Sequence, residues 1–406
     1  MSTTIAQMNI LETQPQTASD LPEWFVALQQ QAWQEFLNAP MPSRKDEVWR
    51  FGNLKQLDFD GFSDEKNTEI KYSIPTLPEG VICLPFAEAL KQHGDLVKEH
   101  FMKAEARLGS AKFAALHKAR VKSGLFVYVP DGVRVEKPIE VSHVIAGNKE
   151  AIFPHTLIIT GKNSEVSVLD RFSSANEDDA GLCIAFNDLI AGDGSKLTYC
   201  AVQELNLNSR MIQVNATTVG RDAHAVAFTL NTGSQWARNE SLSLLNAEGA
   251  HSDMLSCSIP AGTQQYDQRT YQHHAAPHTN SDLLYKNTLF GTSKTVFSGL
   301  ILVDEGAHYT DAYQTCRNLM MEDTTEANSM PGLEINADQV KCSHGSTAAS
   351  ISDEEIFYLQ ARGIGPQQAR RLIAKGFSVE AVERMRNERL EEVVIEAIDR
   401  KFSSIR

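Results

Sequence analysis

The pattern of apolar and polar positions divides the chain into three parts, and the first part is helical. Apolar side chains recur every three or four residues through the segment that contains Trp24, Leu28 and Ala32. This spacing predicts amphipathic helices. We expect a flexible, polar N-terminus over residues 1–20 and a helical N-terminal domain over residues 21–122.

Two further features lie within this N-terminal domain. Residues 85–121 have the mixed three- and four-residue spacing of one or two helices. The polar residues 42–48 lead to Trp49 and Phe51, and we expect a helix to start there and to pack both aromatic rings.

The middle of the chain changes to the two-residue alternation that is typical of β-strands. Glycine-containing turns precede several of these strands and recur at roughly 28 to 31 residues, at positions 161–164, 192–195, 220–223 and 248–251. This period is typical of stacked repeats, in which neighbouring coils bury what one coil cannot. We therefore predict a parallel β-helix core over residues 123–348, with a β-sandwich as the alternative.

The last part returns to helical spacing and predicts a C-terminal helical domain over residues 349–406. Ser352 and Glu355 have the S-x-x-E spacing of a capping box at a helix start. A second helix is expected from Pro366 to Gly376, burying Leu372 among others. A third is expected over residues 378–402.

Composition excludes several classes of protein. The formal net charge of the 406 residues is −14 at pH 7, and no run of lysine and arginine favours nucleic acid or an anionic membrane. No segment has the roughly 20 consecutive apolar residues of a membrane span. The N-terminus lacks the features of a secretion signal. The six cysteines are scattered without a C-x-x-C pair, so we expect free thiols in a cytoplasmic protein.

Motifs of the common enzyme classes do not occur in the sequence. There is no G-x-x-x-x-G-K-[ST] phosphate-binding loop, no G-x-G-x-x-G, no H-E-x-x-H and no G-x-S-x-G. We therefore assign no catalytic residue.

The strongest candidate for chemistry is the pair Cys342 and His344, at the change from strand to helix. In an extended segment, residues two apart point to the same face. Thiolate and imidazole are ligands that suit iron and other transition metals. The simpler interpretation is a small buried cysteine beside a surface histidine at a domain edge.

A second group of histidines is denser but less specific. His273, His274 and His278 lie within six residues and carry three possible metal ligands. Ligand sets usually converge from separate elements, so we favour a solvent-facing or interface role for this group over a metal site.

Three segments near the C-terminus resemble a known family: LEINADQVKCSHGST at 333–347, SDEEIFYLQARGI at 352–364 and ARRLIAKGF at 369–377. PSRKDEVWRF at 42–51 continues the likeness near the N-terminus. These segments resemble the SufB/SufD family, the scaffold subunits of the Suf iron–sulfur cluster assembly machinery. KCSHG at 341–345 is similar to the SufD branch, because SufB typically has an acidic form there.

The resemblance implies a right-handed parallel β-helix between helical flanks, and an accessory scaffold subunit rather than an enzyme. It implies a SufBCD complex, in which the chain pairs with a SufB-like paralogue and docks a SufC-like ATPase on helices within 349–406. A transient iron–sulfur cluster would form at the interface with the paralogue. His344 would be the preferred ligand and Cys342 the second, with the partner supplying the rest. No firmly bound cofactor is expected on this chain alone.

Two other functions are weighed against this one. An exported, carbohydrate-active β-helix enzyme would share the core architecture, although the N-terminus and the helical C-terminus argue against it. A pure interaction scaffold would form the same complex without ligating metal. Whether the isolated chain forms a homodimer, and whether the assembled complex binds flavin, stays open at this point.

Overall fold

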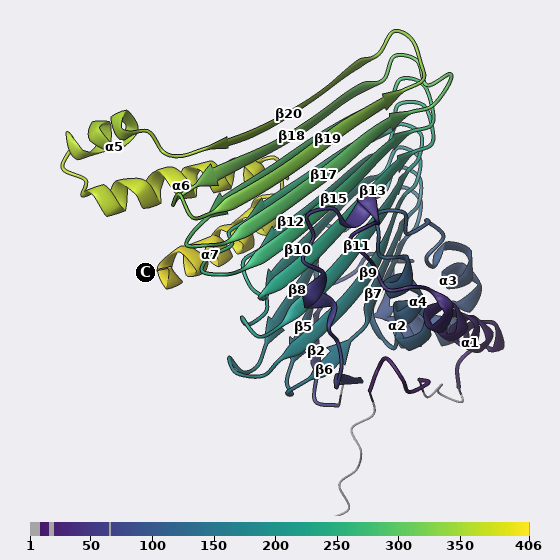
Figure 1. The fold of residues 1–406 in the computed structure, drawn as a ribbon. Coiled ribbons are helices and arrows are strands. Elements are labelled where there is room, and N and C mark those ends of the chain that lie inside the picture. The colour runs from purple at the N-terminus through teal and green to yellow at the C-terminus, as the bar shows by residue number, and fades with distance from the viewer. Residues whose placement is uncertain (1–8, 16–19, 65, 406) are drawn as a thin grey trace, which may run out of the picture.

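The computed structural model describes residues 9–15, 20–64 and 66–405, and one long solenoid of β-strands dominates it (Figure 1). Strands hold 41% of the residues and wind into about eight turns. Successive long strands alternate between two sheets, and each pairs in parallel with the strand two places along the chain. The predicted parallel β-helix is confirmed. The β-sandwich alternative is wrong, because sandwiches are built from antiparallel pairs.

Each of the two sheets runs the length of the solenoid. The 11-stranded sheet contains β1 (Ser63–Asp64), β3 (Ile82–Pro85), β4 (Ser123–Val129), β6 (Glu150–Ile152), β7 (Pro154–Thr160), β9 (Gly181–Ala191), β11 (Arg210–Val219), β13 (Trp236–Leu245), β15 (Gln265–His274), β17 (Lys294–Val303) and β19 (Glu326–Ile335). The 9-stranded sheet contains β2 (Glu69–Ser73), β5 (Ile139–Ile145), β8 (Glu165–Ser174), β10 (Lys196–Glu204), β12 (His224–Asn231), β14 (His251–Ser258), β16 (Asn280–Leu289), β18 (Asp311–Met320) and β20 (Lys341–Ala349).

The turns that the repeat predicted are built around a left-handed residue. Asn163, Gly194, Asp222 and Gly249 each lie two residues before a strand of the 9-stranded sheet, with φ of 53°, 65°, 53° and 75°. Glycine, asparagine and aspartate adopt this conformation at low cost. The sequence therefore fixes where each coil turns.

Four helices and two 3-10 turns come from the N-terminal part: α1 (Glu23–Asn38), α2 (Phe86–Gln92), α3 (Gly94–His100), α4 (Ala111–Arg120), η1 (Glu47–Trp49) and η2 (Leu54–Leu57). They lie on one side of the solenoid, against the outer face of the 11-stranded sheet (Figure 1). Trp33 and Phe113 share an apolar cluster there with Leu182, Ile184 and Ile212 of β9 and β11.

The N-terminal part differs from its prediction in its elements. Residues 86–120 form three helices rather than one or two, because His93, with φ −132° and ψ 34°, interrupts the first. The strands β1, β2 and β3 were not predicted. Residues 1–8 and 16–19 of the expected flexible N-terminus lie outside the described residues, whereas Ile10 is fully buried.

The two aromatic residues after the polar loop behave differently. Trp49 is 2% exposed and packs as predicted, whereas the predicted packing of Phe51 is wrong because this side chain is 53% exposed. Phe51 has a φ of 61°, which turns the chain away after η1. Its ring lies under the Arg50 guanidinium, 5.2 Å from the ring centroid, instead of entering the core.

Three helices end the chain: α5 (Asp353–Gln360), α6 (Pro366–Glu383) and α7 (Glu388–Ser404). The predicted capping box is confirmed, since Ser352 and Glu355 exchange side-chain-to-backbone hydrogen bonds at the start of α5. Helices α6 and α7 cover the outer face of the 9-stranded sheet, where Ala381 and Val394 pack with Phe228 and Leu255.

The predicted break at Gly376 is wrong, because α6 continues through it to Glu383. A glycine inside a helix costs only about 1 kcal/mol relative to alanine. The buried residues Ala374 and Ala381, on either side of it, keep the helix on the sheet. Leu372, which was expected to be buried, is 47% exposed.

The two ends of the solenoid differ in how they are covered. At the first coil, the segment that carries β2 and β3 crosses the end, and its residues Ile70, Leu77 and Val81 pack against the solenoid core. At the last coil, β19 pairs only with β17 and β20 only with β18 within the described part of the chain. We call this second end the open end; β20 forms its upper edge in Figure 1.

Candidate functional site

Cys342 and His344 lie on β20, the last strand of the solenoid. Their partners in register on β18 are Ala312 and Gln314, which are 0% and 1% exposed. Residues paired in parallel strands point the same way, so Cys342 and His344 continue an interior column of side chains. The prediction that they share one face is confirmed, and that face is the interior of the solenoid at its open end.

The surroundings of the pair are partly covered and polar. Cys342 is half-buried and His344 is exposed. Burial, followed by the nearby Asp311 carboxylate, raises the pKa of the Cys342 thiol. Gln314, one coil inward of His344, is buried, and neither polar atom of its amide has a hydrogen-bond partner among the described residues. A buried amide without a partner is costly.

Because β18 is the one strand that pairs with β20 among the described residues, half of the backbone hydrogen-bonding groups of β20 face no partner strand. The N–H of Lys341 donates to the carbonyl of Thr310 at 2.8 Å, so Lys341 faces β18. In a parallel ladder these groups alternate between the two sides of a strand. Cys342, His344 and Ser346 therefore direct their N–H and C=O groups to the free edge.

The edge of β19 is less suited to pairing. The backbone N–H of Glu326 donates to the carbonyl of Ser293 at 3.1 Å. The backbone groups of even-numbered residues of β19 therefore face β17. Pro331 then lies at the free edge, and it has no N–H to offer there. Proline at such positions is a usual way to blunt an edge strand. Of the two free edges, β20 has the more complete set of donors.

His273, His274 and His278 serve three separate local structures. His273 pairs with Asp304 at 2.8 Å. His274 is buried between the hydroxyls of Thr279 and Ser281, and burial lowers its pKa to about 3.

His278 is a turn residue. It has a φ of 58° two residues before β16, and its ring stacks on Tyr309 with the centroids 4.7 Å apart. Within the described parts of the chain, none of these three histidines belongs to a group of three metal-capable side chains.

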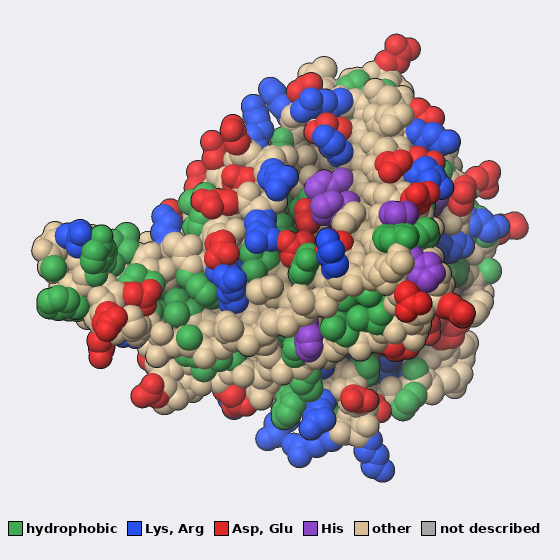
Figure 2. Space-filling view, turned by 90° about the horizontal axis from the view of Figure 1, so that it is seen from above, with side chains coloured by type: hydrophobic (Ala, Val, Ile, Leu, Met, Phe, Trp, Pro, Cys, Tyr) green, Lys and Arg blue, Asp and Glu red, His purple; other side chains and the backbone are tan. Residues whose placement is uncertain are grey.

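The C-terminal helices expose a set of apolar side chains. Helix α5, all of which is described, has no buried residue. It projects beyond the solenoid together with the start of α6 (Figure 1). Phe357 and Tyr358 on α5 and Leu372 on α6 are 70%, 57% and 47% exposed. Figure 2 shows hydrophobic side chains gathered on this projection, at the left.

The comparisons with known proteins agree with this architecture. The family described as "SUF system FeS cluster assembly, SufBD core domain" matches residues 143–377, and "SufBD protein N-terminal region" matches residues 59–141. The chain belongs to the SufBD family. The resemblance found in the sequence is confirmed, and family membership does not support the alternative of a carbohydrate-active enzyme.

Curated SufBD relatives match over most of this chain. The iron–sulfur cluster assembly protein SufD of Escherichia coli (strain K12) is 28% identical over 391 residues, covering 92% of each chain. SufD of Bacillus subtilis (strain 168) is 28% identical over 342 residues, covering 83% of this chain and 78% of its own. SufB of the same organism is 25% identical over 400 residues, covering 88% of this chain and 84% of its own.

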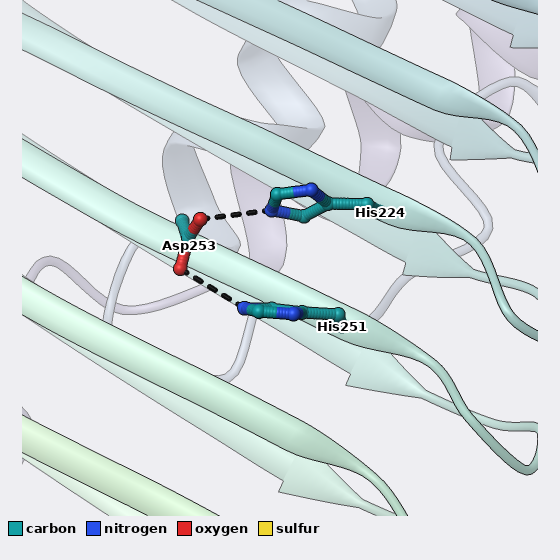
Figure 3. A group of neighbouring side chains, drawn as sticks. All are labelled: His224, His251 and Asp253. Atoms are coloured by element: carbon teal, nitrogen blue, oxygen red, sulfur yellow. Dashed lines mark hydrogen bonds and ion pairs between the residues drawn. The ribbon is translucent and has the colours of Figure 1, made fainter. Parts of the chain in front are cut away.

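The sequence interpretation missed one group of side chains in this SufBD protein. His224, His251 and Asp253 converge on the outer face of the 9-stranded sheet (Figure 3). A signal was present, because both histidines follow the left-handed turn residue of their coil by two positions.

Among the described residues, no helix has the length and apolar character that crossing a bilayer requires.

Proposed function

We propose that this SufBD protein is a SufD-like, non-enzymatic scaffold subunit for iron–sulfur cluster assembly. In this proposal it pairs with a SufB-like paralogue at the open end and docks a SufC-like ATPase on α5. The observation that carries the proposal is the open end itself. There, the last strand of the 9-stranded sheet, β20, presents Cys342 and His344 toward the interior of the solenoid.

Pairing is supported by the cost of leaving the open end uncovered. An exposed strand edge is a template for association and is normally blunted. Pro331 blunts β19, whereas β20 keeps the free groups of Cys342, His344 and Ser346. A partner strand that pairs with β20 would form those hydrogen bonds.

The same pairing would enclose the candidate ligands. An imidazole nitrogen and a thiolate both suit iron. Two side chains cannot complete a cluster site, so the partner would supply the remaining ligands. Because burial raises the pKa of the Cys342 thiol, this group must release its proton to solvent before the thiolate binds iron. The resemblance to the family makes His344 the preferred ligand, through a ring nitrogen of its imidazole.

The test of ligation is anaerobic co-expression with SufB-like and SufC-like subunits, followed by iron and acid-labile sulfide analysis. His344→Ala should remove most of the cluster and Cys342→Ser a smaller share. Ser343→Ala is the matched control, since Ser343 lies between them on the opposite face of β20. Normal cluster content in a correctly assembled His344→Ala complex would favour the pure interaction scaffold instead.

Docking of the ATPase is supported by the exposed side chains of α5. Clusters of exposed apolar side chains mark interaction surfaces. The start of α6 projects from the solenoid and places α5 away from it (Figure 1). Docking at this position would let nucleotide-driven movement of the ATPase act on the paired solenoids through α6, as a two-state gate.

A charge substitution tests this docking without removing a helix that the core needs. Phe357→Glu should abolish capture of the ATPase in a pull-down, because it places a carboxylate in the apolar surface. Leu207→Glu alters a side chain of similar exposure, 56%, in the loop between β10 and β11, and should leave capture intact. Equal capture by both variants would remove α5 from this role.

A further inference from the structure

A compact group of three side chains lies on the outer face of the 9-stranded sheet. His224 and His251 are the first residues of β12 and β14 and lie opposite each other in register. Asp253 follows His251 by two residues and so shares its face. The carboxylate lies between the two imidazoles, with Asp253 Oδ2 at 2.8 Å from His224 Nε2 and Oδ1 at 3.2 Å from His251 Nε2 (Figure 3).

The group is reachable from solvent yet partly enclosed. The side chains of His224, His251 and Asp253 are 31%, 42% and 19% exposed. Their possible ligand atoms all lie within 4.8 Å of one another. Ligand atoms about 2.0–2.2 Å from a tetrahedral ion are about 3.3 Å apart. The two N–O separations are close to that value, so an ion could enter with a small spreading of the side chains and release to solvent of the protons that the two hydrogen bonds share.

The chemistry of the donors points to one class of ion. Two imidazole nitrogens with one carboxylate oxygen bind zinc in catalytic-type sites, where a fourth position stays open for water. The same set forms the facial triad of non-haem ferrous sites. Calcium and magnesium prefer sites built from oxygen atoms alone.

The surrounding charges are balanced. Asp282 on β16 forms an ion pair with Arg384, and Arg386 places a further positive charge near His251.

We propose that His224, His251 and Asp253 form a binding site for one divalent transition-metal ion, Zn²⁺ or Fe²⁺, that retains open coordination positions. The site is complete on this chain and needs no partner subunit. It joins two consecutive coils, so a bound ion also cross-links β12 to β14. It is separate from the candidate ligands of the open end, which lie on β20 and face the interior.

The experiment measures Zn²⁺ affinity by competition with a chromophoric chelator, using the full chain under anaerobic conditions. The background is Cys342→Ser/His344→Ala, which removes the ligands of the open end. We expect one equivalent of Zn²⁺ to bind, and His251→Gln or Asp253→Asn to weaken binding by at least about 100-fold. That lower limit follows because loss of an outer-shell partner alone costs up to about 100-fold.

His273→Gln is the matched control, because His273 pairs with Asp304 at 2.8 Å but belongs to no group of three metal-capable side chains among the described residues. It should leave Zn²⁺ affinity unchanged. Parallel titrations with Fe²⁺ distinguish the two ions, and tighter binding of either one supports the site. Affinity that is the same in the background chain and in His251→Gln would overturn the proposal.

A second measurement does not depend on the variants folding. A crystal of the wild-type chain soaked in Zn²⁺ should show an anomalous peak between His224, His251 and Asp253. A zinc peak elsewhere with none at this position would equally overturn the proposal.

Discussion

The two ends of this solenoid are built from the same kind of coil, yet the interior is covered at the first coil and exposed at the last. At the first coil, Leu77 and Val81 cross the end and pack on the interior. The helical layer adds Phe86 and Phe101, which pack with Phe126 of β4, and all three are at most 5% exposed. At the last coil, every residue of β20 except Cys342 is exposed, although inward-facing positions continue from β18.

The difference shows how a repeat protein separates stability from function. Each coil is stabilised by its neighbours, so a terminal coil needs either a cap or a partner. The covered end has a cap supplied by the same chain. The open end keeps a thiol and an imidazole where a cap would otherwise lie. Substitutions at the covered end and at the open end should therefore differ in their effects on stability and on pairing.

The largest effect is expected from a cavity at the covered end. Phe86→Ala removes a fully buried ring that lies 5.6 Å from the ring of Phe101, measured between centroids. It should lower the free energy of unfolding by about 3–5 kcal/mol. Leu333→Ala truncates a half-buried side chain of β19 and should cost only about 1 kcal/mol in the isolated chain. Urea unfolding measures both values, and equal losses would contradict the comparison.

A smaller effect concerns acid stability in the helical layer on the 11-stranded sheet. His117 on α4 is fully buried, and burial, with a smaller contribution from His155 and Lys118, holds its pKa well below 6.5. The unfolded chain therefore binds a proton below pH 6.5 that the folded chain does not. Through this group, stability should fall as the pH drops below 6.5, by up to about 1.4 kcal/mol per pH unit.

The His117→Asn variant tests this linkage, since its amide can still donate to the carbonyl of Ile184, which His117 Nδ1 contacts at 2.9 Å. Whatever its absolute stability, the variant should lose less stability than the wild type between pH 6.5 and pH 5. His344→Ala removes an exposed imidazole at the open end and serves as the control. An unchanged pH slope in His117→Asn would show that another group is responsible.

The smallest effect on the isolated chain is expected at the free edge of β20. Ser346→Pro removes an N–H that faces solvent, so the free energy of unfolding should change by less than about 0.5 kcal/mol. Pairing with a SufB-like subunit, measured by co-purification, should nevertheless be lost. Thr347→Pro removes an N–H that faces β18 and should destabilise the chain itself. If Ser346→Pro pairs normally, the partner does not add to β20.

Much of the fold could be predicted because it depends on local pattern. The left-handed turn residues recur with each coil, and the alternation around Cys342 fixed which residues share its face. The capping box at Ser352 is likewise a local signal. The continuation of α6 through Gly376 could not be predicted, since contacts of α6 with the sheet outweigh the low helix propensity of one glycine. Phe51 was misjudged because a φ of 61° cannot be read from an aromatic residue.

By itself, the sequence determined the repeat, the turns, the shared face of Cys342 and His344, and the SufBD resemblance. All of these depend on residues near one another in the chain or on a fixed period. Only the tertiary structure decided that β20 is an open edge and that His224 and His251 meet across two coils. Those features follow from how coils stack in register, and stacking brings together residues that no local period connects.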